Sequence, residues 1–333
     1  MSDIQADALR QADADGEPFP RSLCADYARQ LSTVQNWRGS VAILVQWLTI
    51  AIAALLAIWS GHWLGYLLAI IVIGTRQHAL AIIAHDAAHY RLFTSRVVND
   101  VVANLTLAYP LGISLSRYRP FHLDHHRFSY IDPERDPEKQ YIQTDSKWQW
   151  PKSPGAALRI IVMDLLGLNI ATLWGLLRQF SPWFIYFNSD VSGEYLKTGE
   201  RILLSGFAVV VVSTIALTDS WVYFVLLWLL PLATVTTVVF RLRTIAEHSS
   251  LADDHELRST RTVLPALFER LLIAPCNVNY HLEHHLYPSV PFYNLEKLHR
   301  RLLTQPEFRR NAHISKAYTD FKSGVIREVT RKG

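Results

Sequence analysis

Hydrophobic and polar positions along this chain form long blocks. The first apolar block covers residues 41–60 (VAILVQWLTIAIAALLAIWS), and the second follows the short turn GHW and covers 64–84. Two further blocks, at 203–218 and 221–240, are separated only by the dipeptide DS. Twenty helical residues extend over about 30 Å, the thickness of the hydrocarbon core of a bilayer. The pattern predicts four membrane-spanning helices arranged as two hairpins.

Polar residues interrupt the second apolar block at Arg76, Gln77 and His78. Such groups are costly at membrane depth unless they face protein or water, so we expect this helix to have a partnered or functional face. Two weaker apolar runs, at 101–115 and 157–178, lie between the hairpins. We expect helices that pack against the membrane domain or lie on its surface, although either run could form a full span.

Composition and charge narrow the class further. Half of the 333 residues are hydrophobic, and the formal net charge is +4. There is no interleaved basic and aromatic pattern suited to nucleic acid. Cys24 and Cys276 belong to no metal-binding or disulfide motif. The predicted architecture is an all-α, polytopic membrane protein: a tail over 1–40, one membrane domain over 41–310 with a helical cap, and a second tail over 311–333.

The distribution of Lys and Arg predicts the orientation. The two hairpin turns, at 59–63 and 218–221, contain neither residue, whereas the amino-terminal flank, the middle segment and the last third contain most of them. By the positive-inside rule, both termini and the middle segment should be cytoplasmic.

Histidines are concentrated in three short boxes on that predicted side. The boxes are HDAAH, HLDHH and HLEHH, and they contain eight of the 14 histidines: His85, His89, His122, His125, His126, His281, His284 and His285. Residues at i, i+3 and i+4 share one side of a helix, so each box should present its imidazoles in one direction. His248, just beyond the fourth apolar block, is a ninth candidate, and it follows an expected Arg243–Glu247 pair.

Nine imidazoles exceed what one zinc ion needs and suit two metal ions. Imidazole binds Fe, Cu, Zn and Ni alike, but a membrane setting favours redox chemistry on a hydrophobic substrate, and therefore iron. Metal-bound imidazoles usually donate their other N–H to a carboxylate or carbonyl. Residues that could accept such bonds lie in or near the boxes: Asp86, Asp124, Glu247 and Glu283. We interpret His78 as a residue that lines a substrate tunnel or supports a ligand. Asp132 and Asp136, in the acidic loop after the second box, could reach that box, but an acidic, proline-rich loop does not require such a role.

The set of boxes resembles that of the membrane fatty acid desaturase superfamily, and the segment at 277–291, NVNYHLEHHLYPSVP, is especially close to the family pattern. Relatives in this superfamily include sphingolipid desaturases, carotenoid ketolases and hydroxylases, and alkane hydroxylases. The resemblance covers about 41–300. It implies a non-haem di-iron centre held by the nine histidines, four spans under a cytosolic cap, and O2-dependent C–H chemistry. Some relatives place an Asn that holds a metal-bound water at the position of Thr244, and Asn277 is a weak substitute for it.

The expected activity is therefore that of an O2-dependent lipid desaturase whose catalytic residues are these nine histidines. A hydroxylase or ketolase of the same superfamily remains an alternative, and a membrane zinc hydrolase or a metal transporter is a more remote one. The chain contains no segment typical of an electron carrier, so a separate ferredoxin, or a cytochrome b5-like protein with its reductase, should supply electrons. A basic face that includes Arg300, Arg301, Arg309 and Arg310 should either dock that donor or contact phospholipid head groups.

Overall fold

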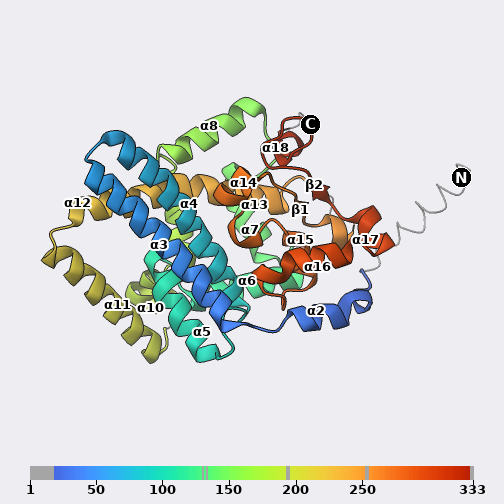
Figure 1. The fold of residues 1–333 in the computed structure, drawn as a ribbon, viewed down its shortest axis with the longest axis horizontal. Helices are drawn as coiled ribbons and strands as arrows, with labels where there is room; N and C mark the ends of the chain where they lie inside the picture. Colours follow the sequence, from blue (N-terminus) through green and yellow to red (C-terminus); the bar gives the residue numbers. More distant parts are fainter. Residues whose placement is uncertain (1–18, 130, 133, 193–195, 252–254, 331–333) are drawn as a thin grey trace, which may run out of the picture.

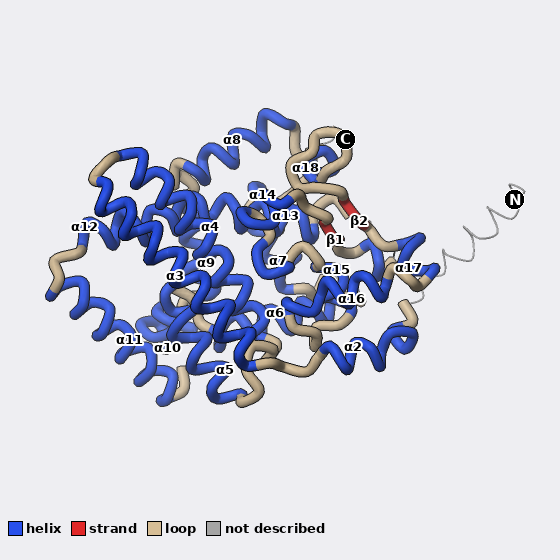
Figure 2. The backbone as a smooth tube through the Cα atoms, in the orientation of Figure 1, coloured by secondary structure: helices blue, strands red, loops and turns tan. Residues whose placement is uncertain are grey.

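Helices dominate the fold. The computed structural model describes residues 19–129, 131–132, 134–192, 196–251 and 255–330. The described part is mostly helical, and its two strands, β1 (Thr262–Val263) and β2 (Ile314–Ser315), pair in parallel (Figure 2). Of the tail predicted over 1–40, residues 1–18 lie outside the described residues.

Four helices are long and apolar enough to cross a membrane, as predicted. They are α3 (Asn36–Ser60), α4 (Trp63–Ala88), α11 (Thr198–Leu217) and a fourth span, Trp221–His248. The fourth span consists of α12 (Trp221–Phe224), π-helical segments at Val225–Leu229 and Leu232–Thr236, and α13 (Thr237–His248). These spans lie towards one end of the molecule, and the cap elements α15 to α18 lie towards the other (Figure 1).

The spans extend beyond the predicted apolar blocks because their last turns are polar but still helical. α4 ends at Ala88, so that it includes His85, and α13 ends at His248. α4 is the central span: 61% of its apolar window is buried, against 11% for α11. Gly74 permits its close approach to the fourth span, because a Cβ there would lie 2.5 Å from Cβ of Val235.

Two of the three polar residues that interrupt α4, Arg76 and Gln77, have hydrogen-bond partners, whereas both ring nitrogens of His78 are buried without one among the described residues. Gln77 Nε2 donates to the carbonyl of Trp228 at 2.9 Å, and Thr236 Oγ1 donates to Gln77 Oε1 at 2.8 Å. Arg76 Nη1 donates to Gln46 Oε1 on α3 at 3.2 Å. Because buried polar groups without partners are destabilising, these bonds explain how the helix tolerates polarity at this depth.

The two weaker apolar runs between the hairpins, at 101–115 and 157–178, do not form straight membrane-spanning helices. The run at 101–115 is divided between α5 (Arg96–Ala103), a π-helical segment (Asn104–Ala108) and a short 3₁₀ turn that ends at Gly112. The run at 157–178 forms α8 (Pro154–Leu165) and α9 (Ile170–Phe180), which meet at an angle of 67°. Gly167, with φ of 67°, lies in the break between them.

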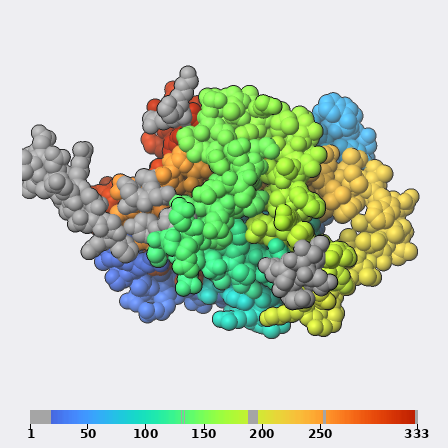
Figure 3. Space-filling view, turned by 180° about the vertical axis from the view of Figure 1, so that it is seen from behind, coloured from blue at the N-terminus to red at the C-terminus, as the bar shows by residue number. Residues whose placement is uncertain are grey.

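The cap and its connections consist of short helices. Seen from the opposite side, the middle of the chain, coloured green, covers the centre of the molecule (Figure 3). The remaining helices are α2 (Ala25–Leu31), α6 (Leu115–Phe128), α7 (Pro137–Thr144), α10 (Pro182–Ser192), α14 (Leu267–Leu272), α15 (His281–Leu286), α16 (Leu295–Leu302), α17 (Pro306–Asn311) and α18 (Val325–Val329).

A buried ion pair connects the fourth span to α8. The side chains of Arg241 and Asp164 are both fully buried, and Asp164 accepts hydrogen bonds from the guanidinium of Arg241 and from Asn169. Trp148 covers the guanidinium, with its ring centroid 4.1 Å from Cζ. Removal of one partner would leave an uncompensated buried charge.

Residues 311–330, which belong to the tail predicted over 311–333, pack against the end of the fourth span as part of the cap. Tyr318, Val325 and Val329 are buried in a core cluster with Ile245 of α13, because their apolar side chains find a surface there. Glu328 reinforces this contact. Burial opposes its charge, but hydrogen bonds from His313 and Ser315 and the charge of Arg261 lower its pKa to about 2.

Candidate metal centre

Nine histidines from four helices and their ends meet between the spans and the cap. α4 supplies His85, and its C-cap is His89. α6 supplies His122, His125 and His126, α13 supplies His248, and α15 supplies His281, His284 and His285. The structure thus brings together all nine histidines that the sequence analysis selected, although 196 residues separate His89 from His285.

The nine rings form two groups. A five-histidine cluster contains His85, His89, His122, His126 and His284, and a four-histidine cluster contains His125, His248, His281 and His285. Within each cluster, one nitrogen from every ring lies within 4.8 Å of the others. Two ligands on one ion, each at about 2.1 Å, are at most about 4.2 Å apart, so each cluster is close to the size of a metal site.

The two HxxHH boxes divide their histidines between the clusters, so the prediction that each box points in one direction is wrong. His122 and His126, at i and i+4, join the five-histidine cluster, whereas His125 joins the other. In the last box the assignment is reversed: His281 and His285 join the four-histidine cluster and His284 joins the first. Adjacent helical residues differ in direction by about 100°, which separates the i+3 ring from the i+4 ring.

The short distances between histidine ring nitrogens are better explained by a shared cation than by hydrogen bonds between the rings. His122 Nε2 lies 2.9 Å from His89 Nε2 and 3.1 Å from His126 Nε2, and His126 Nε2 lies 3.0 Å from His284 Nε2. A neutral ring nitrogen carries at most one hydrogen, so the chain of contacts cannot consist entirely of good hydrogen bonds. A shared cation would engage all of these lone pairs, and the clusters are therefore consistent with a di-metal site.

The protonation of the rings supports the same interpretation. Burial, reinforced by neighbouring cationic groups, lowers the pKa of His89 to about 3. Burial also holds the pKa values of other rings well below the ordinary 6.5, namely those of His122, His126, His281, His284 and His285. These rings are neutral at physiological pH, and neutral imidazole is the form that binds metal.

A carboxylate orients His125, and a second carboxylate lies beside His281. Asp136 accepts from His125 Nδ1 through both oxygens, at 2.9 and 3.0 Å, which turns His125 Nε2 into the cluster. Glu247 Oε1 lies 3.4 Å from His281 Nδ1 and accepts from Arg243 Nε at 2.6 Å, so the expected Arg243–Glu247 pair is present. Such acceptors fix the ring and raise the basicity of the ligand.

The other predicted outer residues have different partners. Asp124 is exposed on α6 and is not brought into either cluster. Glu283 accepts from His299 Nδ1 and Thr262 Oγ1, each at 2.6 Å, and therefore supports the base of α15. Asn277 Oδ1 accepts from Arg270 at 2.6 Å.

Asp86, the remaining predicted acceptor, lies beside the first cluster. Its Oδ1 is 3.8 Å from His85 Nδ1, too far for a hydrogen bond, and its Oδ2 accepts from the backbone N–H of Phe292 at 2.8 Å. Asp86 thus connects α4 to the segment that follows the last box.

Sequence reasoning gave no role to two residues of the acidic loop, Asp136 and Glu138. Glu138 lies 3.6 Å from His125 Nε2 (Oε2) and 3.9 Å from His248 Nε2 (Oε1). Burial alone would lower the pKa of His125, but Glu138 and Asp136 outweigh it and raise that pKa. The sequence does contain a signal: Asp-Pro-Glu is typical of a helix start, and Asp136 caps α7 by accepting from the N–H of Glu138.

Comparison with known proteins identifies the family. The family model described as fatty acid desaturase matches residues 61–317. The chain belongs to the fatty acid desaturase family. It is 28% identical over 320 residues to a dihydrorhizobitoxine desaturase from Bradyrhizobium elkanii, which covers 92% of this chain and 87% of that protein.

Two β-carotene ketolases also match this desaturase-family chain. The protein from Paracoccus sp. (strain N81106 / MBIC 01143) is 29% identical, with 65% of this chain and 72% of the ketolase covered. The protein from Paracoccus sp. (strain PC1) is 27% identical, with 80% of this chain and 92% of the ketolase covered. The chain is thus an oxidoreductase of the desaturase family, which implies a membrane setting and an electron donor.

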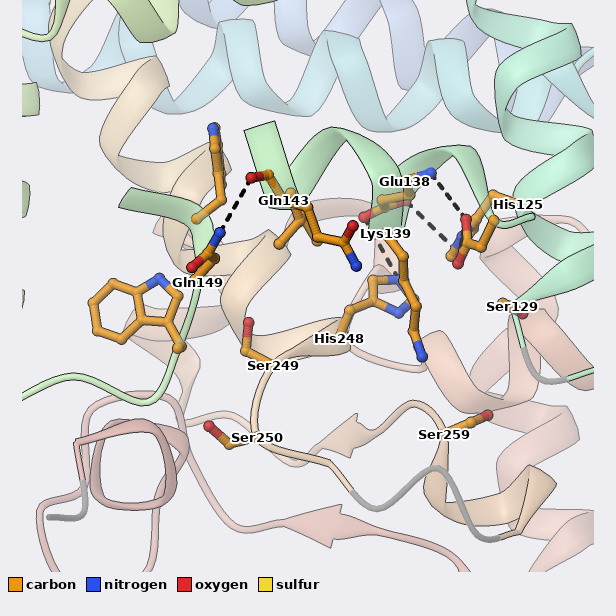
Figure 4. Close-up of a pocket in the computed structure, with 14 residues that line it drawn as sticks. His125, Ser129, Glu138, Lys139, Gln143, Gln149, His248, Ser249, Ser250 and Ser259 are labelled. Atoms are coloured by element: carbon orange, nitrogen blue, oxygen red, sulfur yellow. Dashed lines mark hydrogen bonds and ion pairs between the residues drawn. The ribbon is translucent and has the colours of Figure 1, made fainter. Parts of the chain in front are cut away.

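Two cavities adjoin the clusters of this desaturase-family protein. The larger, of about 530 Å³, is lined mainly by apolar and aromatic side chains of α9, the fourth span and the segment at 109–113. Its wall also includes His78, which belongs to neither cluster, and Tyr118, whose ring stacks on His122 with centroids 5.2 Å apart. The smaller cavity, of about 220 Å³, is polar and reaches His125 and His248 (Figure 4).

Proposed function

We propose that this protein is an O2-dependent lipid desaturase that forms a carbon–carbon double bond at a di-iron centre. The observation that carries the proposal is the placement of two buried histidine clusters beside an apolar cavity of about 530 Å³. A cavity of that size and lining suits an extended hydrocarbon chain. The dihydrorhizobitoxine desaturase, whose match covers most of both chains, supports desaturation in particular.

The nine clustered histidines would hold the two iron ions. Iron in this setting would supply the redox chemistry that uses O2 to oxidise an unactivated C–H bond. The chain holds the rings in place: Asp136 orients His125, Glu247 lies beside His281, and burial lowers the pKa of His89 and His122 so that both rings are neutral. This prearrangement reduces the cost of organising the ligands when metal binds.

The cavity positions the substrate. Its apolar wall would hold the alkyl chain, and its lining also includes Tyr118, whose ring stacks on His122, and Glu138, which lies 3.6 Å from His125 Nε2. Desaturation removes two hydrogen atoms from adjacent carbons, and O2 is reduced to two molecules of water. The substrate supplies two of the four electrons required, and the external donor supplies the other two. Fixing two neighbouring C–H bonds near the metals selects the bond to be oxidised.

Lipid profiling of an expressing host tests the proposal. Cells that express the wild-type chain should accumulate a new unsaturated lipid, and cells that express His284→Ala should not. His62→Ala provides a matched control, because His62 is exposed in the α3–α4 turn, remote from either cluster. A double bond that the His284→Ala variant also produces would refute the site.

A hydroxylase or ketolase is the second candidate function, and the two β-carotene ketolase relatives favour it. Both reactions begin with removal of hydrogen from carbon, and the outcome then depends on how the substrate is held. A hydroxylated or oxo product without new unsaturation would favour this candidate. A zinc hydrolase or metal transporter is the remote alternative, and metal analysis that finds one Zn and no Fe would support it.

We further propose that the clusters and both termini face the cytoplasm. The absence of Lys and Arg from the turns at 59–63 and 218–221 supports this orientation. The exposed arginines of α16 and α17 would then offer a cytoplasmic docking face to an acidic ferredoxin or cytochrome b5-like donor. Of two reporters fused in turn to the carboxyl terminus, the one that works only in the cytoplasm should be active, and the one that works only outside it should be inactive. The opposite pattern would contradict the orientation.

A further inference from the structure

Glu138 lies between the two cavities and beside the smaller histidine cluster. It is in the first turn of α7 and lines both the polar and the apolar cavity. We propose that Glu138 is the fifth ligand of the metal ion at the four-histidine cluster, an inference that rests on the proposed function. The two metal sites would then differ: five imidazoles at one, and four imidazoles with one carboxylate at the other.

The carboxylate of Glu138 lies close to two of the four rings, those of His125 and His248. Its Oε2 is 3.6 Å from His125 Nε2, and its Oε1 is 3.9 Å from His248 Nε2. Ligands that share an ion with bonds of about 2.0–2.2 Å are at most about 4.2 Å apart. His125 Nε2 is buried without a hydrogen-bond partner among the described residues, so it is available to the ion. Figure 4 shows Glu138 joined to both rings by dashed lines.

The two boxes contribute equally to the clusters, but the remaining histidines do not. Each HxxHH box gives two rings to one cluster and one ring to the other, so that both clusters receive three. The first cluster is completed by two further histidines, His85 and His89, but the second by His248 alone. Glu138, beside His125 and His248, is the carboxylate that we propose as the fifth donor of the second cluster.

The same short segment organises the carboxylate and one of its neighbouring ligands. Asp136 accepts from His125 Nδ1 and also from the backbone N–H of Glu138 at 2.9 Å. Pro137 fixes the backbone between them as the first residue of α7. The charge is also appropriate, because a dication surrounded only by neutral imidazoles in a buried site benefits from an anionic ligand.

The test compares the iron sites of purified full-length protein. The wild type, Glu138→Gln, Glu138→Asp and Glu134→Gln are each loaded with ⁵⁷Fe(II) without oxygen, and iron content and Mössbauer spectra are recorded. Glu134→Gln is the matched control, because Glu134 is exposed in the same loop. The wild type and the control should show two distinct ferrous sites.

A ligand role predicts that Glu138→Gln weakens only one of the two sites. The iron affinity of that site should fall at least tenfold. Loss of a residue that only supports a ligand already weakens metal binding by about tenfold or more, and loss of a ligand itself should cost no less. Glu138→Asp, with a shorter carboxylate, should show intermediate retention and a shifted spectrum at the same site. Retention of the other iron in each variant shows that the protein is folded.

Two outcomes would overturn the inference in different ways. Wild-type iron content and spectra in both Glu138 variants would mean that Glu138 only pairs with histidine, and the proposed function would stand. A wild-type protein that binds no iron would reject the proposed function together with this inference.

Discussion

Asp136 offers a sharp test of how the protein prepares its second metal site. The side chain is 1% exposed, and both of its oxygens accept from His125 Nδ1. Asp136→Asn keeps the shape and one acceptor oxygen but removes the negative charge and the second acceptor. Loss of such a supporting group typically weakens metal binding 10–100-fold, or about 1.4–2.8 kcal/mol.

Asp136→Ala distinguishes the effect of Asp136 on metal binding from its effect on the start of α7, because this variant removes both acceptor oxygens. It also removes the cap of α7, which should cost about 1 kcal/mol of folding stability. Asn can still accept from the N–H of Glu138, so thermal melts should distinguish the two variants. Asp132→Asn is the control, because Asp132 is partly exposed and lies 3.9 Å from Arg135 on the surface.

The assay is chelator competition on iron-loaded protein. In Asp136→Asn, one of the two irons should be lost at a chelator concentration 10–100-fold below that needed for the wild type, and the other iron should be retained. Wild-type retention of both irons, or equal loss of both, would refute the view that Asp136 acts on the His125 site alone.

Three further outcomes follow from packing and charge. Ala233→Phe places a ring in the apolar cavity and should reduce the turnover of long-chain substrates more than that of short-chain substrates. The control Ala216→Phe, on the exposed surface of α11, should not have this effect. Equal chain-length profiles for the two variants would contradict the cavity assignment. Asp164→Ala leaves Arg241 as an unpaired buried charge and should cost about 3–5 kcal/mol of stability, seen as a lower melting temperature. Glu328→Gln should lower the melting temperature at pH 7, and the difference from the wild type should shrink at pH 3.5. The pKa of Glu328 is about 2 in the folded protein, against an ordinary value of 4.5. Its charge therefore stabilises the fold above pH 4.5, and this contribution is lost as the pH falls towards 2. A difference that grows on acidification would contradict the assigned partners.

The spans and the set of clustered histidines were readable from the sequence for physical reasons. A bilayer requires about 20 apolar residues per helix, and the four blocks meet that requirement independently of the rest of the chain. Histidines spaced at i, i+3 and i+4 mark helix faces, and their concentration at the ends of α4 and α13 predicts a common depth.

The division into clusters and the roles of the acids depend on tertiary placement. The sequence spacing cannot show that α6 and α15 approach so that His284 joins His126, with nitrogens 3.0 Å apart. Glu283 resembles an acceptor for its own box, but its nearest ring is that of His299. Asp136 and Glu138 become neighbours of His125 only because the chain turns back after α6. The packing of residues 311–330 similarly depends on an apolar surface formed by distant segments.

The metal content of the purified full-length chain tests the central claim most directly. Protein produced with iron available and analysed for all transition metals should contain two Fe per chain, one for each cluster. His126→Ala should remove iron from the five-histidine cluster, and His281→Ala should remove it from the four-histidine cluster. Protein that contains one Zn and no Fe, or variants that retain both metals, would contradict the account.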